Sequence, residues 1–69
     1  MKPEEIIYNS VLKLDPNYAA TLEDFSVSIY NNRELLEGLS ESLYDIATPE
    51  LTKAVDDVRS TYATGHKAR

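Results

Sequence analysis

Cysteine is absent from this 69-residue sequence, so the chain can form neither a disulfide bond nor a thiolate metal site. Gly38 and Gly65 are its only glycines, which excludes a glycine-rich phosphate-binding loop. No apolar run approaches the roughly 20 residues that a transmembrane helix requires. Residues 1–5 carry two early carboxylates and no apolar core, unlike a signal peptide. These absences predict a cytoplasmic protein, or, for a viral protein, one of the host cytoplasm or the virion.

Residue patterns of catalytic and metal sites are also missing. The single histidine, His66, lies beyond the expected end of the last helix. The adjacent carboxylates Glu4-Glu5 and Asp56-Asp57 point to different sides of a helix rather than converging on one ion. No acidic loop of the calcium-binding kind is present, and the serines have no histidine to activate them. We therefore predict that the chain is not an enzyme and carries no cofactor or metal.

Basic residues are few and scattered. Seven Lys and Arg stand against twelve Asp and Glu, which gives a net charge of -5. Nucleic-acid binding needs a basic patch, and the only basic cluster here is the short tail at 66–69. The acidic balance fits an anionic membrane surface equally badly. The expected partner is therefore a protein, either another protein or a second copy of the chain, with no direct nucleic-acid or membrane contact.

Turn-forming and helix-capping residues occur at regular intervals in the sequence. They divide it into four stretches, each with apolar side chains at helical spacing. This pattern predicts an all-α fold, a small bundle of three to four short helices arranged as helical hairpins. Residues 1–65 would form one domain and residues 66–69 a frayed basic tail. The boundaries are Pro3, Asp15-Pro16-Asn17, Asn31-Asn32, Thr48-Pro49 and Gly65.

The first two helices are expected at residues 3–14 and 18–30. Pro3 suits the first helical position, where a missing N–H costs nothing. Asp15 precedes a proline and is therefore pushed out of helical geometry, which ends the first helix. The second helix has its apolar stripe from Tyr18 onward. Residues 25–29 also alternate like a strand, so a strand stays open as the alternative there.

The third and fourth helices have clearer start signals. Asn32 can cap the third helix, and Thr48 followed by Pro49 can start the fourth, which would end at Gly65. Gly38 costs the third helix about 1 kcal/mol relative to alanine, and either marks a close helix approach or is simply tolerated. The apolar stripe of the third helix consists of Leu36, Leu39, Leu43 and Ile46.

The hexapeptide Leu-Asp-Pro-Asn-Tyr-Ala at positions 14–19 resembles the junction between consecutive tetratricopeptide repeats. In that family a helix ends in a similar Leu-Asp-Pro and a new helical pair follows. Pro16 to Pro49 is close to one repeat period of about 34 residues. The resemblance implies a helical hairpin that contributes to a concave peptide-binding groove. Three positions depart from the family pattern, where Trp, Leu and Gly are typical: Leu22, Phe25 and Ser26.

Two groups of residues are candidates for partner binding. The first is a row of carboxylates that helical geometry places within roughly 80° of one another on the outer face of the third helix. It is either a docking face for a basic partner or, as we favour, a solvated outer face. The second group is three tyrosines beside the apolar stripes, which either cap the core or anchor an interface. The carboxylates are Glu34, Glu37, Glu41 and Asp45, and the tyrosines are Tyr8, Tyr30 and Tyr44.

These observations predict a small acidic protein that acts by protein–protein contact as an accessory or assembly subunit. Its size and composition would suit a viral or phage-encoded protein. Apolar residues outside the tightest stripes could be shared with a second chain, which favours an oligomer. One alternative is an inhibitor whose acidic helix face occupies the nucleic-acid-binding site of a basic partner. The other is a single tetratricopeptide-like hairpin that binds a peptide. The residues available for sharing are Ile6, Leu12, Val27 and Leu35.

Overall fold

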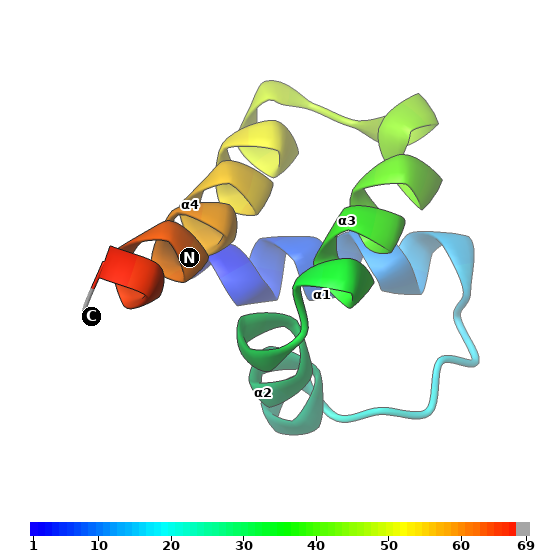
Figure 1. The fold of residues 1–69 in the computed structure, drawn as a ribbon. Coiled ribbons are helices and arrows are strands. Elements are labelled where there is room, and N and C mark those ends of the chain that lie inside the picture. Colours follow the sequence, from blue (N-terminus) through cyan, green and yellow to red (C-terminus); the bar gives the residue numbers. More distant parts are fainter. Residues whose placement is uncertain (68–69) are drawn as a thin grey trace.

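The computed structural model describes residues 1–67, with side chains as far as Tyr62. Within that range the chain forms helices and no strand (Figure 1), which confirms the predicted all-α fold. A broad loop joins α1 to α2, and a second connection carries the chain from α3 to α4. The elements are α1 (Pro3–Leu14), α2 (Leu22–Asn31), α3 (Arg33–Ser42), the 3₁₀ turn η1 (Tyr44–Ile46) and α4 (Pro49–Lys67).

Side-chain caps start two of the helices as the sequence predicts. The Oδ1 atom of Asn32 accepts a hydrogen bond from the backbone N–H of Leu35 at 3.2 Å. The Oγ1 atom of Thr48 accepts one from the N–H of Leu51 at 3.1 Å, and Pro49 takes the first position of α4. Each cap satisfies one of the backbone donors that a helix start leaves without a partner.

The start of α2 differs from the prediction. The helix begins at Leu22 rather than Tyr18, because Thr21 acts as its cap and accepts a hydrogen bond from Asp24 N–H at 3.1 Å. Residues 15–21 form a connection outside any helix. Residues 25–29 lie inside α2, so the strand alternative is wrong.

The later helix ends also differ. Helix α3 ends at Ser42, and the chain then tightens into η1, so Ile46 is not part of a continuous apolar stripe and is 36% exposed. Helix α4 continues to Lys67, so the predicted end at Gly65 is wrong. The predicted frayed tail at 66–69 falls partly on residues 68–69, outside the described part of the chain.

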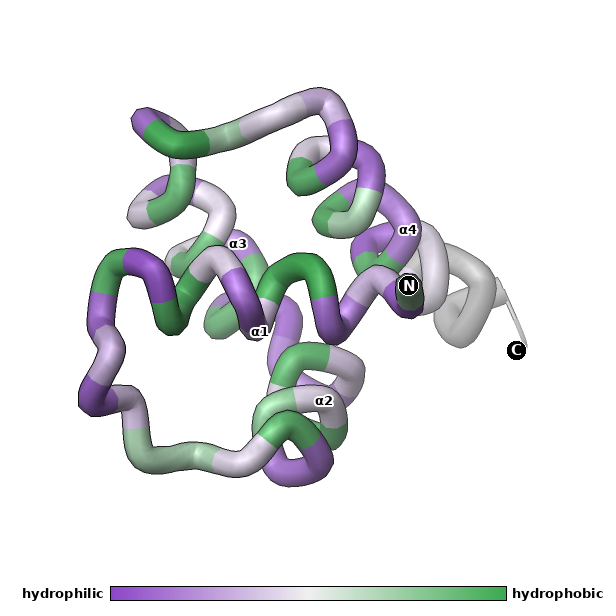
Figure 2. The backbone as a smooth tube through the Cα atoms, turned by 180° about the vertical axis from the view of Figure 1, so that it is seen from behind, coloured by the Kyte–Doolittle hydropathy of each residue, from purple (hydrophilic) through white to green (hydrophobic). Residues whose placement is uncertain are grey.

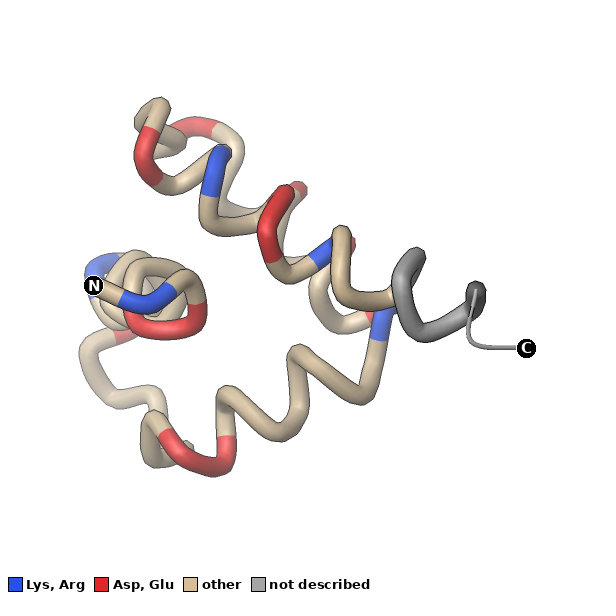
Figure 3. Tube along the Cα trace, turned by 90° about the vertical axis from the view of Figure 1, so that its left-hand side faces the viewer, with Lys and Arg blue, Asp and Glu red and all other residues tan. Residues whose placement is uncertain are grey.

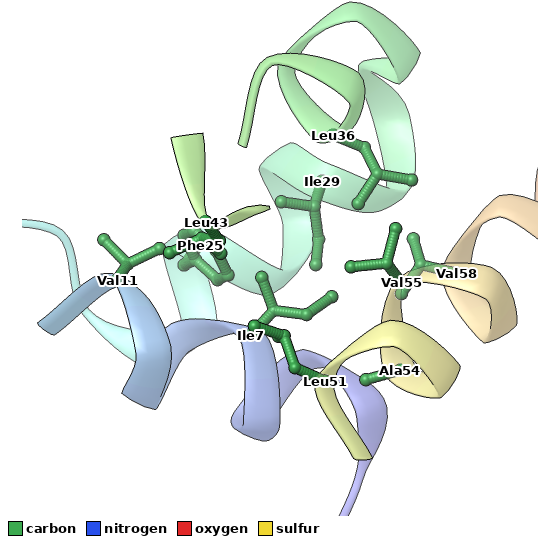
Figure 4. Close-up of a cluster of buried hydrophobic side chains, with 10 residues drawn as sticks. All are labelled: Ile7, Val11, Phe25, Ile29, Leu36, Leu43, Leu51, Ala54, Val55 and Val58. Atoms are coloured by element: carbon green, nitrogen blue, oxygen red, sulfur yellow. The ribbon is translucent and has the colours of Figure 1, made fainter. Parts of the chain in front are cut away.

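The core is one cluster of buried apolar side chains from all four helices and from Leu43, which precedes η1 (Figure 4). Ile7 of α1 points into the middle of this cluster. Helix α1 packs most extensively against α4, although the two are far apart in sequence. The cluster consists of Ile7, Val11, Phe25, Ile29, Leu36, Leu43, Leu51, Ala54, Val55 and Val58.

The apolar residues that could have been shared with a second chain are mostly used within this one. Ile6 and Leu35 pack against the core, and Leu12 is half-buried. Val27 is the exception, with 62% of its surface exposed. The oligomer was expected because these four apolar residues could be shared with a second chain. Folding of the single chain already covers most of their surface.

Candidate functional site

The predicted row of carboxylates is broken by an ion pair. The guanidinium of Arg59 on α4 binds Glu37 on α3 through two hydrogen bonds, Nε to Oε2 at 2.7 Å and Nη2 to Oε1 at 2.8 Å. Its Nη1 atom also binds Asp56 at 2.7 Å. The hydrogen bond to Arg59 holds the pKa of the Glu37 carboxyl below its ordinary value, and the pair raises the pKa of Arg59. Glu37 therefore links two helices, whereas the sequence predicted an outer position that was either solvated or open to a basic partner.

The other three carboxylates do not form one helical row. Glu34 and Glu41 are exposed on α3, but Asp45 lies in η1, beyond the end of that helix. The prediction of one continuous acidic face is therefore wrong at Asp45. Acidic and basic residues both occur along α4 (Figure 3), where Lys53 lies between Glu50 and Asp56 and Arg59 follows Asp57.

Tyr8 is used inside the fold. Its hydroxyl donates a hydrogen bond to the carbonyl of Ala20 at 2.5 Å. Its ring lies 6.2 Å from the ring of Tyr18 and 5.3 Å from that of Phe25, centre to centre. Tyr8 thereby holds the connection between α1 and α2 against the core.

Tyr30 is also used inside the fold. Its hydroxyl donates a hydrogen bond to Oε1 of Glu4 at 3.0 Å and so joins α2 to the first turn of α1. The pKa of Tyr30 is raised to about 12, mainly by burial of the hydroxyl and to a smaller extent by the interaction with Glu4. Tyr62 of α4 is half-buried and packs against the core.

Tyr44 differs from the other two candidates. It lies in η1 with 78% of its surface exposed, beside a hollow of about 250 Å³ between α3, η1 and α4. The floor of this hollow, which we call the Tyr44 hollow, consists of the buried side chains of Leu43, Leu51 and Val55. Its margin is formed by Ser40, Tyr44, Ala47, Thr52, Asp56 and Arg59.

A second hollow, of about 430 Å³, also borders η1, on the side of Ile46. It is lined in part by Met1 and Leu14, both of which are exposed. Of the large apolar side chains exposed in the described part, only Val27 lines neither of these two hollows. Figure 2 shows a hydrophobic stretch in the connection between α3 and α4.

The sequence did not indicate Leu14 and Ile46 as surface residues, because both fall in apolar stripes. A local signal existed for Leu14, which directly precedes the Asp15-Pro16 helix stop and so lies in the last, least covered turn of α1. For Ile46 no local signal existed, because its exposure follows from the change of the chain into η1.

The described residues show no arrangement of three His, Asp or Glu side chains that could hold a metal ion. Nor does any described helix combine the length and the apolar character needed to cross a bilayer. Comparison of the chain with protein-family models, with curated proteins and with solved structures finds no match.

Proposed function

We propose that this protein acts by protein–protein contact, as a small accessory or assembly subunit, through the end of the molecule around η1. We call this region the η1 surface and define it by Leu14, Tyr44, Ile46 and Ala47. The observation that supports the proposal best is the position of Tyr44, an exposed aromatic side chain beside a hollow whose floor is the apolar core.

The physical argument concerns the cost of leaving apolar surface in water. Each square ångström of apolar surface removed from water contributes about 25 cal/mol, so a gathered apolar surface favours association. Scattered exposed apolar residues need no explanation, whereas gathered ones mark interaction sites. Tyrosine is enriched at interface centres, because its ring supplies contact area while its hydroxyl tolerates water.

The same proposal places the protein in the cytoplasm or in a virion. The support is the absence of cysteine, which suits a reducing compartment. A viral or phage origin has only the small size and the composition of the chain in its favour.

The two alternative functions have less support. An inhibitor that imitates a row of phosphates needs a continuous set of free charges, but Glu37 is bound to Arg59 and Asp45 lies outside α3. A tetratricopeptide-like hairpin would rely on α2 and α3 as a packed pair. Those two helices are separated by Asn32 alone, and the most extensive packing is between α1 and α4.

The test compares Tyr44→Ala with Val27→Ala, because both positions are exposed but only Tyr44 borders the hollow. Tagged wild-type and variant proteins are used to capture partners from cells that produce the protein, and the captured partner is quantified by mass spectrometry. Tyr44→Ala should reduce capture by more than about tenfold, as removal of an interface anchor does. Val27→Ala should leave capture unchanged. Equal capture by both variants, with helical circular dichroism retained, would contradict the proposal.

A further inference from the structure

We infer that the Tyr44 hollow binds a positively charged segment of a partner protein that inserts one large apolar side chain. This inference rests on the proposed function and specifies the chemistry of the partner.

The size and lining of the hollow fit one inserted side chain. Its volume is about 250 Å³, and an apolar protein cavity of about 150 Å³ is already large enough to bind benzene. Leu43, Leu51 and Val55 form an apolar floor, so a leucine or an aromatic side chain that enters would exchange water for close contact. Tyr44 at the margin adds a ring face against which such a side chain, or an arginine, can pack.

The charge around the hollow indicates the sign of the partner. Asp56 lines it, and Asp45 directly follows Tyr44. Glu41 lies four residues after Glu37 on the same face of α3, and Glu37 points towards Arg59 at the margin of the hollow. Among residues 1–62, neither Glu41 nor Asp45 has an ion-pair partner.

The one cation at the margin does not offset these carboxylates. The guanidinium of Arg59 is already bound to Glu37 and Asp56, so this group of three carries a net negative charge. Glu41 and Asp45 directly follow the lining residues Ser40 and Tyr44 in sequence, so the region around the apolar floor carries a net negative charge. Complementary charge on a partner would speed its approach and select against acidic competitors.

A second copy of the chain would be a poor occupant of this hollow. The chain carries a net charge of -5, and two copies meeting at η1 would bring two regions of net negative charge together. Repulsion of like charges opposes that contact. A basic segment meets no such opposition, so it is the occupant that the surface favours.

The first experiment selects partners without assuming a sequence. A phage-displayed library of random peptides about 12 residues long, enough for three helical turns, is selected on the immobilised wild-type protein. The library is counter-selected on Ala47→Trp, in which the new ring fills the hollow from its margin. The expected binders combine several Lys or Arg residues with one Leu, Phe or Trp.

The second experiment measures the affinities of the selected peptides by fluorescence anisotropy. Ala47→Trp should weaken binding by about tenfold or more. Thr52→Tyr, which narrows the hollow from α4, should act in the same direction and keeps the test valid if one filling variant does not fold. The matched control is Ala19→Trp, which adds the same ring at an exposed alanine that lines neither of the two hollows described above and should leave the affinity unchanged.

The third experiment separates local from overall charge. The double variant Glu41→Gln/Asp45→Asn should weaken peptide binding and reduce its dependence on salt. The control, Glu23→Gln/Asp24→Asn, removes the same number of charges from exposed positions on α2 and should change binding much less.

Each outcome decides the inference. Binders that are neutral or acidic, or that bind Ala47→Trp as tightly as wild type, would overturn it while leaving protein contact as the function. A library without any binder would also overturn it, and partner capture with the Tyr44 variant would then decide separately on the proposed function. Sedimentation that shows a dimer of the wild type and a monomer of Ala47→Trp would identify a second copy as the occupant and overturn the basic partner.

Discussion

At the scale of single residues, Tyr30 links the stability of the fold to alkaline pH. Its pKa is raised to about 12, mainly by burial and then by its hydrogen bond to Glu4, whereas an ordinary tyrosine has a pKa of about 10. Between these values the unfolded chain loses the phenolic proton while the folded chain keeps it, so the unfolded state binds fewer protons. Stability from this group is therefore complete below about pH 10 and is lost as the pH rises towards 12.

Replacing Tyr30 by Phe should remove this alkaline dependence. At neutral pH the variant should lose about 0.5–1.5 kcal/mol, because the hydrogen bond to Glu4 is gone. Above pH 10 the difference between variant and wild type should shrink. Urea midpoints at neutral and alkaline pH measure both effects, and Tyr44→Phe is the control at an exposed ring. An unchanged difference across the two pH values would show that the proton on Tyr30 is not coupled to folding.

Gly38 gives a second prediction at this scale. A Cβ atom built at this position meets no other atom within 4 Å, so the glycine does not mark a close helix approach and is simply tolerated. Gly38→Ala should therefore stabilise the protein by about 0.5–1 kcal/mol, because alanine loses less backbone entropy in a helix. A rise in the urea midpoint is expected. A fall would mean that α3 has a neighbour at this position in solution, for example a bound partner.

The tyrosines show what the sequence can and cannot predict about single residues. All three candidates lie beside apolar stripes, yet only Tyr44 is exposed as an interface anchor would be. The partner of Tyr8 is 12 residues away and that of Tyr30 is 26 residues away. These hydrogen bonds depend on how the helices pack, so the local spacing of residues does not reveal them.

At the scale of helices, the cap of α4 can be tested directly. Thr48→Ala removes the oxygen that accepts from Leu51 N–H and should destabilise the protein by about 1 kcal/mol. Thr52→Ala is the control, because Thr52 lies in the same helix and has no capping role. Chemical unfolding in urea compares the two. If both variants unfold at the wild-type midpoint, the cap contributes nothing to stability.

Helix starts were predictable where the signal is local. Asn32 and Thr48 form their caps within three residues of themselves, and both were predicted correctly. The start of α2 was not, because Tyr18 continues the apolar stripe in sequence. Its ring instead packs edge-on against Phe25 from outside the helix, at 6.0 Å between centres. The ring of Tyr18 is thus partly buried, although its backbone is not helical as its spacing in the sequence had suggested.

At the scale of the whole molecule, the candidate surface arises from segments that are distant in sequence. Leu14 at the end of α1 and Ile46 in η1 border one hollow, and the Tyr44 hollow combines α3 with the first turns of α4. The sequence predicted the four helices, but it contains no local signal for which helix ends meet. Likewise it predicted the row of carboxylates but not that Arg59, 22 residues further along, would bind Glu37.

Because of that ion pair, charge reversal at Glu37 and charge reversal at Glu41 should change stability differently, although both residues lie on the same face of α3. Glu37→Lys should lower the urea midpoint, because it breaks the two hydrogen bonds that join α3 to α4 and places a cation beside Arg59. Glu41→Lys should leave the midpoint unchanged or raise it slightly, since it relieves repulsion between like charges by a few tenths of a kcal/mol. The double variant Glu37→Lys/Glu41→Lys is therefore expected to destabilise the fold.

Acid unfolding gives an independent measure of the same link. The pKa of Glu37 is lowered by its hydrogen bond to Arg59, so the folded state binds fewer protons than the unfolded state in mild acid. Stability from the pair is then complete above the ordinary glutamate pKa of about 4.3 and is lost as the pH falls through the lower folded value. Glu37→Gln should lose less stability than wild type over this range, whereas Glu41→Gln should follow wild type. Parallel acid profiles for wild type and Glu37→Gln would show that the titration of Glu37 is not coupled to folding.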